Sequence, residues 1–166
     1  MTAAGRAWVL PAGVDTDQLA PGGTMKHGIE VTARHCLESL RPEFARQVRP
    51  GDFVVAGHDF GIGSSREQAA SVLVHLGVAA VIAPSFAGLY FRNAFNVGLL
   101  LLSCPQAAQI RDGELIAIDA RGARVMRSDA SVLACEPIPG FLLDLIDAGG
   151  LLPQLKRRFK PATEMP

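Results

Sequence analysis

The chain of 166 residues has few aromatic residues and no excess of charge. Aromatic residues make up 6% of it, and 16 Lys and Arg balance 16 Asp and Glu. Nucleic-acid-binding surfaces usually combine a basic face with aromatic side chains, which this composition does not offer. No apolar run approaches the roughly 20 residues of a membrane-spanning helix, and the N-terminus lacks the apolar core of a signal peptide. We therefore expect a cytoplasmic protein that binds neither nucleic acid nor membrane.

Cysteine is also scarce, which argues against a metal centre in this chain. Cys36, Cys104 and Cys135 are far apart and form no Cys-x-x-Cys pair. Zinc and iron–sulfur sites are usually recognised by such pairs, and the four histidines show no ligand spacing either. An odd number of separated cysteines is typical of free thiols in a reducing compartment. We expect no metal or other cofactor in this chain.

What the chain does contain is enough for a folded core. Hydrophobic residues make up 49% and charged residues 19%, which is typical of a globular protein, and the length fits one domain over 1–166. Apolar runs predict strands at 7–10, 52–56, 78–83 and 99–102, and helical spacing predicts helices at 30–40, 69–76 and 86–96. A loop is expected at 14–24, a hairpin at 114–126 and one or two helices within 140–159. The order predicts an α/β fold with a mixed sheet.

The most informative segment is Gly57–Gln68, which reads GHDFGIGSSREQ. Its glycines let the backbone approach a ligand closely, and the start of the following helix would offer free N–H groups to an anion. Arg66 adds a planar guanidinium that suits a carboxylate or a phosphate. The pattern is neither a Walker A loop nor a G-x-G-x-x-G fingerprint. It predicts an anion-binding site of another kind.

Two groups near this motif have a structural and a functional interpretation. The S-S-R-E run at 64–67 matches a capping box, in which Ser64 caps the next helix. The Ser64 hydroxyl can instead act on a bound carboxylic acid, provided that amide donors and Arg66 stabilise its alkoxide. The pair Asp15 and Asp17 can orient a substrate hydroxyl, or serve as solvated or helix-capping loop residues. A capping residue of the helix at 86–96 is expected at Ser85.

Several segments together resemble a known family. The run Gly57–Ala70, the V-I-A-P-S-F-A run at 81–87 and the R-N-A-F-N-V-G-L run at 92–99 are similar to small subunits of 3-isopropylmalate dehydratases. These are free-standing swivel domains of the aconitase superfamily. D-T-D at 15–17, P-G-D at 50–52 and G-G-L-L at 149–152 also agree, so the resemblance covers almost the whole chain. It implies a swivelling β/β/α domain with a central mixed sheet flanked by helices.

The resemblance also implies a reaction. The chain would be the small subunit of a hydro-lyase that dehydrates or isomerises a hydroxy di- or tricarboxylic acid, as in leucine biosynthesis. A separate large subunit would carry a [4Fe–4S] cluster whose open iron binds the substrate hydroxyl, and only the heterodimer would be active. The isolated chain could also self-associate. By the family pattern the catalytic base is Ser64, and the substrate-binding residues are Ser65, Arg66, Asp15, Thr16 and Asp17.

The loop Pro21–His27 leaves the substrate open. Family members commonly carry Arg-Tyr-Leu after Pro-Gly, whereas this chain has Gly23, Thr24 and Met25, and the residues that follow select the substrate side chain. Lys26 adds a cation there, so one hypothesis is that Thr24 and Lys26 bind substrate and that Lys26 pairs with a third carboxylate, as in a homoaconitase-type acid. A solvated lysine is the alternative. A non-catalytic module that binds carboxylate or phosphate is the alternative from another class.

Overall fold

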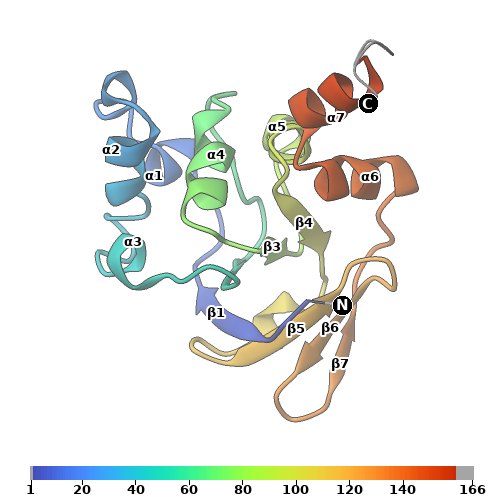
Figure 1. The fold of residues 1–166 in the computed structure, drawn as a ribbon. Coiled ribbons are helices and arrows are strands. Elements are labelled where there is room, and N and C mark those ends of the chain that lie inside the picture. The colour runs from blue at the N-terminus through green and yellow to red at the C-terminus, as the bar shows by residue number, and fades with distance from the viewer. Residues whose placement is uncertain (1, 160–166) are drawn as a thin grey trace.

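Residues 2–159 of the chain are described by the computed structural model in Figure 1; Met1 and residues 160–166 of the domain predicted over 1–166 lie outside the described part. The strands form one sheet in the order β4-β3-β2-β1-β5-β6-β7. They are β1 (Gly5–Val9), β2 (Phe53–Val55), β3 (Ala80–Ala83), β4 (Leu100–Ser103), β5 (Leu115–Asp119), β6 (Arg124–Arg127) and β7 (Val132–Ala134).

The helices lie on either side of the parallel strands, with α1 to α4 on the left of Figure 1 and α5 to α7 on the right. They are α1 (Thr16–Leu19), α2 (Ile29–Arg34), α3 (Phe44–Gln47), α4 (Gln68–His75), α5 (Gly88–Asn96), α6 (Gly140–Ala148) and α7 (Leu151–Arg158), with short 3-10 turns η1 (Met25–His27) and η2 (Ala107–Gln109). No helix within residues 2–159 combines the length and the apolar character needed to cross a membrane.

The sheet is mixed, as the sequence predicts. Strands β1 to β4 run parallel, with register pairs such as Ala7 with Phe53 and Val54 with Val81. All residues of β2 and β3 are buried, because helices cover both faces of parallel strands. Strands β5, β6 and β7 pair antiparallel, and β5 alternates buried with more exposed positions, as a half-solvated sheet does.

The two edges of the sheet approach each other although β4 and β7 stand at opposite ends of its order. The Glu136 amide donates to the Ser103 carbonyl at 2.8 Å, and the Cys104 thiol donates to the Ala134 carbonyl at 3.7 Å. These contacts join the residues after β7 to the end of β4. The sheet therefore curls around the core, and part of each edge is protected from pairing with another chain.

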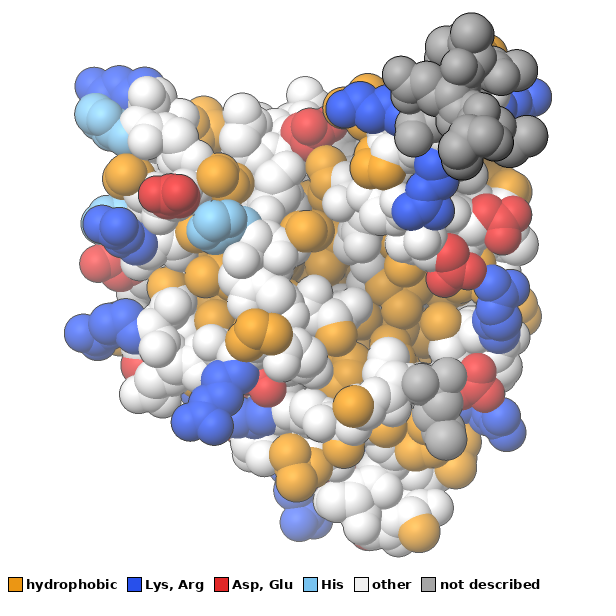
Figure 2. Space-filling view, in the orientation of Figure 1, with side chains coloured by type: hydrophobic (Ala, Val, Ile, Leu, Met, Phe, Trp, Pro, Cys, Tyr) orange, Lys and Arg blue, Asp and Glu red, His pale blue; other side chains and the backbone are white. Residues whose placement is uncertain are grey.

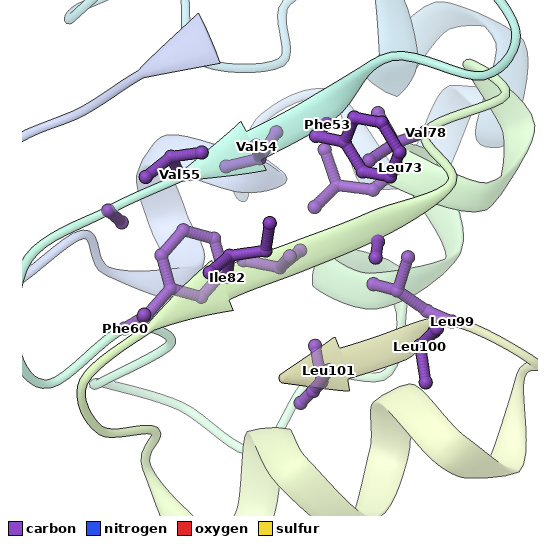
Figure 3. Packing of buried hydrophobic residues seen from close by; sticks show 14 of the residues in the cluster. Phe53, Val54, Val55, Phe60, Leu73, Val78, Ile82, Leu99, Leu100 and Leu101 are labelled. Atoms are coloured by element: carbon purple, nitrogen blue, oxygen red, sulfur yellow. The ribbon is translucent and has the colours of Figure 1, made fainter. Parts of the chain in front are cut away.

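The core lies among the parallel strands and the helices beside them. Figure 3 shows Phe53, Ile82 and Leu101 in one cluster, and each is at most 1% exposed. On the face drawn in Figure 2, hydrophobic side chains gather in the centre, while charged side chains lie mainly along the margins. This core fixes the ends of β1 and β2, from which the loops of the candidate site begin.

Asp52 is a buried carboxylate that joins β1 to β2. It accepts hydrogen bonds from Trp8 Nε1 at 3.0 Å, from the Arg6 amide at 3.1 Å and from the Arg49 amide at 2.9 Å. Trp8 is fully buried and meets the Phe44 ring edge-on, with ring centroids 5.2 Å apart. The Asp52 carboxylate thus accepts three hydrogen bonds near the starts of β1 and β2.

The structure differs from the sequence predictions at three helices. The helix predicted at 30–40 ends at Arg34, because Leu37 adopts a left-handed conformation with φ of 59°. The loop predicted at 14–24 contains α1, which Asp15 caps. Helix α5 begins at Gly88 without a side-chain cap, so the prediction of Ser85 as its N-cap is wrong. Strand β7 and helix α3 are too short to show a period, and the sequence did not predict them.

Substitution of Asp52 by Ala should lower the free energy of unfolding by roughly 3 kcal/mol, because it leaves three N–H donors without their acceptor. Urea denaturation followed by the fluorescence of Trp8, the one tryptophan of the chain, measures the loss. Asp52→Asn is the matched control, since it keeps an acceptor oxygen and should lose less. Wild-type stability in Asp52→Ala would contradict the role given to this carboxylate.

Candidate active site

The loops that follow β1 and β2 pair with each other at the carboxyl ends of these strands. The Thr16 amide donates to the Ile62 carbonyl at 2.8 Å, and the Gly61 amide donates to the Val14 carbonyl at 2.7 Å. Asp15 and Ile62 form a parallel bridge between the two loops. Ligands of parallel α/β sheets generally bind beyond the carboxyl ends of the strands. Residues 15–17 and the glycine motif are therefore brought to one place.

Two glycines are required by the shape of the motif. Gly61 has φ of 82°, and a Cβ there would overlap the ring of Tyr90. Gly63 has φ of 102°, and a Cβ there would lie 3.0 Å from Thr16 Oγ1. Both positions thus need a residue that tolerates positive φ and occupies little space. The glycines let the motif pass closely over α5 on one side and α1 on the other.

Ser64 is exposed and its hydroxyl is held by two residues. Arg66 Nε donates to Ser64 Oγ at 2.6 Å, and Thr16 Oγ1 lies 3.3 Å from the same oxygen. The Ser64 amide donates to Thr16 Oγ1 at 3.0 Å. Because a guanidinium can only donate, Ser64 Oγ is an acceptor in this arrangement. Such an environment favours negative charge on the serine oxygen.

The capping interpretation of Ser64 is wrong. Helix α4 begins at Gln68 with Glu67 at its N-cap position, and no side chain caps it. The amides of Ala69 and Ala70 bond to the carbonyls of Arg66 and Glu67, so they are not free for an anion. The amides of residues 65–68 make no hydrogen bond within residues 2–159, so the use of this helix start as an anion site stays a prediction.

Arg66 is held in place by groups from the loop after β1. Its Nη1 donates to Asp17 Oδ1 at 2.8 Å and to the Ala20 carbonyl at 2.9 Å. Its Nη2 makes no hydrogen bond within residues 2–159 and is left for a ligand. The Arg66 hydrogen bond, with a further one from the Gly22 amide, lowers the pKa of the Asp17 carboxyl below its usual value. Asp17 is thus an ionised anchor for the guanidinium.

Asp15 shapes the loop. Its Oδ1 accepts hydrogen bonds from the Asp17 and Gln18 amides, each at 2.8 Å, and Gln18 Oε1 accepts from the Asp15 amide at 2.9 Å. This is a capping box at the start of α1. The helix-capping interpretation of Asp15 is confirmed, and Asp17 is turned toward Arg66 as a result.

The other predicted residues are placed differently. Ser65 is exposed beside Ser64, and its carbonyl accepts a hydrogen bond from Asn93 Nδ2 at 2.9 Å. Thr24 Oγ1 donates to the Pro21 carbonyl at 2.7 Å, and Lys26 is exposed on η1. Across residues 2–159, no hydrogen bond or ion pair joins Thr24 or Lys26 to Ser64 or Arg66. The structure therefore groups residues 15–17 with Ser64 and Arg66, and the Pro21–His27 loop contacts this group through the hydrogen bond from the Gly22 amide to Asp17.

Two residues that hold the motif were not recognised from the sequence. Asn93 lies on the buried side of α5 next to Ala94 and supports the backbone of Ser65. Ser85 Oγ accepts from the Asp59 amide at 2.9 Å and donates to Asp59 Oδ1 at 3.1 Å, which fixes the start of the motif. An amide side chain on an apolar helix face was the available signal for Asn93. No local pattern indicated the partner of Ser85.

Cavity size does not mark this site. A cavity of about 630 Å³ is lined by Arg6, Arg46, Arg49 and Asp52 among others and shares no residue with the motif. A smaller cavity of about 370 Å³ lies beside the site and is lined by residues that include Asp17. The hydroxyls of the motif themselves lie on open surface. The grouping of polar side chains, rather than the depth of a pocket, identifies the site.

Comparison with known proteins agrees with this fold. The model of the aconitase C-terminal domain family matches residues 23–107. The chain is 42% identical to 3-isopropylmalate dehydratase small subunit 1 of Archaeoglobus fulgidus, over 89% of this chain and 93% of that protein. It is also 42% identical to the methanogen homoaconitase small subunit of Methanothermobacter thermautotrophicus, over 89% of this chain and 87% of that protein.

A solved structure agrees as well. The crystal structure of 3-isopropylmalate dehydratase (LeuD) of Methanocaldococcus jannaschii matches with a TM-score of 0.89 and 37% identity, over 95% of each chain. The curled mixed sheet with its flanking helices is thus that of an aconitase-type swivel domain. The chain belongs to the aconitase C-terminal domain family, among the 3-isopropylmalate dehydratase and homoaconitase small subunits.

The pKa of Asp17 provides a direct test of the ion pair. A carboxyl-detected NMR titration should place it below 3.8, the value of an unperturbed aspartate, because Arg66 and the Gly22 amide favour the carboxylate. The pair therefore stabilises the fold above pH 3.8, and this contribution is lost as the pH falls through the lowered pKa.

Arg66→Gln should return the Asp17 pKa toward 3.8. Arg124→Gln, which removes the separate surface pair with Asp119, is the matched control and should leave Asp17 unchanged. An Asp17 pKa that is insensitive to Arg66→Gln would show that the two groups do not interact in solution.

Proposed function

We propose that this chain is the small subunit of a hydro-lyase that dehydrates and rehydrates a hydroxy di- or tricarboxylic acid, with a 3-isopropylmalate-type acid as the leading substrate. The names of the relatives in Archaeoglobus fulgidus and Methanothermobacter thermautotrophicus support this class of activity. The observation that carries the proposal is the 2.6 Å hydrogen bond from Arg66 Nε to an exposed Ser64 hydroxyl. It places a cation against an oxygen that faces the open surface.

In this proposal Ser64 is the base that takes a proton from the substrate carbon. A serine hydroxyl is a poor base because its alkoxide is unstable in water, and the charge of Arg66 at hydrogen-bond distance offsets that cost. Substrate carboxylates would bind to Arg66 Nη2 and to the exposed Ser65 hydroxyl. Asp17 keeps the guanidinium oriented while Nη2 carries the substrate, so it acts through Arg66.

A large-subunit partner follows from the same relatives, which are named as small subunits. We propose that this partner carries a [4Fe–4S] cluster, which would supply the Lewis acid for the leaving hydroxyl. Two observations on residues 2–159 support this division of roles: Cys36 lies in the core, and no three His, Cys, Asp or Glu side chains converge there. The part assigned to this chain is proton transfer and carboxylate binding.

The choice between substrates rests on Lys26. Relatives named for two different acids are equally similar to this chain, at 42% identity, so overall similarity does not distinguish them. Lys26 is exposed on η1 and makes no ion pair within residues 2–159. Its charge favours the second candidate, a homoaconitase-type subunit whose substrate has a third carboxylate.

Ser64→Ala should lower kcat of the complex reconstituted with its large subunit by at least about a hundredfold, because the base is removed. Turnover is followed by formation of the unsaturated intermediate from the hydroxy acid. Ser71→Ala is the matched control on α4, where within residues 2–159 that hydroxyl bonds only to the Glu67 carbonyl, and should keep wild-type activity. Melting temperatures of both variants should stay within a few degrees of wild type.

Retained turnover in Ser64→Ala would refute the assignment of the base. A wild-type complex that binds carboxylic acids but turns none of them over would favour the non-catalytic binding module.

Lys26→Ala tests the choice of substrate. If Lys26 pairs with a third carboxylate, kcat/KM should fall about tenfold or more for a homocitrate-like acid and stay near wild type for an alkylmalate, because only the first loses a charge-assisted contact. The matched control is Lys26→Arg, which keeps the charge. An equal loss on both substrates, or none on either, would contradict the hypothesis.

A further inference from the structure

We propose that Thr16 is a positioning residue that donates a hydrogen bond to the deprotonated oxygen of Ser64. This inference rests on the proposed function, in which Ser64 is the base. It gives Thr16 a role different from contact with substrate. Its basis is a pair of hydrogen bonds between two residues that lie 48 positions apart in the chain.

The backbone of Thr16 is held by hydrogen bonds, and its side chain is buried. It is 2% exposed, its amide bonds to the Ile62 carbonyl at 2.8 Å, and its carbonyl accepts from the Ala20 amide at 2.9 Å. A β-branched side chain has few χ1 rotamers, so a fixed backbone also fixes the hydroxyl. Gly63 lets this hydroxyl come close, since a Cβ there would lie 3.0 Å from Thr16 Oγ1. A buried hydroxyl is thus held against Ser64.

The direction of the hydrogen bond between the two hydroxyls depends on the protonation of Ser64. Thr16 Oγ1 accepts the Ser64 amide at 3.0 Å and lies 3.3 Å from Ser64 Oγ. While Ser64 carries its proton, either hydroxyl can be the donor. Once the exposed Ser64 has released its proton to solvent, its oxygen can only accept, so the Thr16 hydroxyl must donate. The alkoxide then has two donors, Thr16 and Arg66 Nε.

This arrangement should stabilise the basic form of Ser64 more than the neutral form. The hydrogen bond from Thr16 becomes charge-assisted when Ser64 is an alkoxide, and it weakens when Ser64 takes the proton from the substrate carbon. No other acceptor within residues 2–159 competes for the Thr16 proton. The hydrogen bond from the Ser64 amide to Thr16 Oγ1 keeps the hydroxyl oxygens of Thr16 and Ser64 close together. Thr16 thus acts on the substrate only through Ser64.

Thr16→Val tests this role, because valine keeps the shape and removes the hydroxyl. The reconstituted complex should lose roughly a hundredfold in kcat, as for loss of one oxyanion donor, with KM within about threefold of wild type. The limb of the pH–rate profile that rises with pH should shift to higher pH, because an alkoxide with one donor fewer forms less readily. Thr16→Ser, which restores the hydroxyl, should recover most of kcat and the original profile.

Thr32→Val is the matched control. Thr32 is also buried, at 1% exposure, and its hydroxyl donates to the Gly28 carbonyl at 3.0 Å within α2. This variant should leave kcat and the pH profile unchanged. If Thr16→Val melts far below wild type, Thr16→Cys is measured in its place. A thiol is a weaker hydrogen-bond donor than a hydroxyl, so the pH–rate profile of Thr16→Cys should shift in the same direction.

The outcomes separate this inference from the proposed function. Wild-type kcat and pH profile in Thr16→Val, together with an inactive Ser64→Ala, would overturn the role of Thr16 and keep Ser64 as the base. An unshifted profile with a raised KM would overturn it too, since that result describes contact with substrate. Full activity in Ser64→Ala would refute the proposed function itself.

Discussion

The site depends on the backbone pairing between the loops that follow β1 and β2. The amides of Thr16 and Gly61 bond across to Ile62 and Val14, and these bonds hold the two loops as one unit. Parallel strands end at the same edge of a sheet, so the core that aligns β1 with β2 also aligns their loops. The buried strands therefore set the distance between the D-T-D segment and the glycine motif. If the pairing shifted by one residue, Thr16 would no longer face Ser64.

Arg66 is the electrostatic centre of that unit. It joins the hydroxyl of Ser64 to the carboxylate of Asp17 and to the Ala20 carbonyl, and its Nη2 makes no hydrogen bond within residues 2–159. A lysine has no planar set of donors and cannot make these contacts at once. The site is open, since Ser64 and Ser65 are both exposed.

Much of the fold was predictable because its strands are continuous apolar runs. The predictions at 52–56, 78–83 and 99–102 agree with β2, β3 and β4, since strands covered on both faces carry no polar positions to obscure them. Helix α1 was missed because four residues show no period, and it exists through the Asp15 cap. The motif was likewise recognised from its glycines, serines and arginine. The support from Asn93 was not, because that contact joins residues distant in the chain.

The sequence by itself determined the kinds of group at the site and the family to which the chain belongs. It did not decide whether Ser64 caps a helix, because S-S-R-E at 64–67 matches a capping box. The tertiary structure decided that it does not. The positive φ of Gly63 and the approach of α1 turn Ser64 toward Thr16 and Arg66, and helix α4 begins only at Gln68. A local pattern fixes which hydrogen bonds a serine can make, whereas long-range packing selects the ones that form.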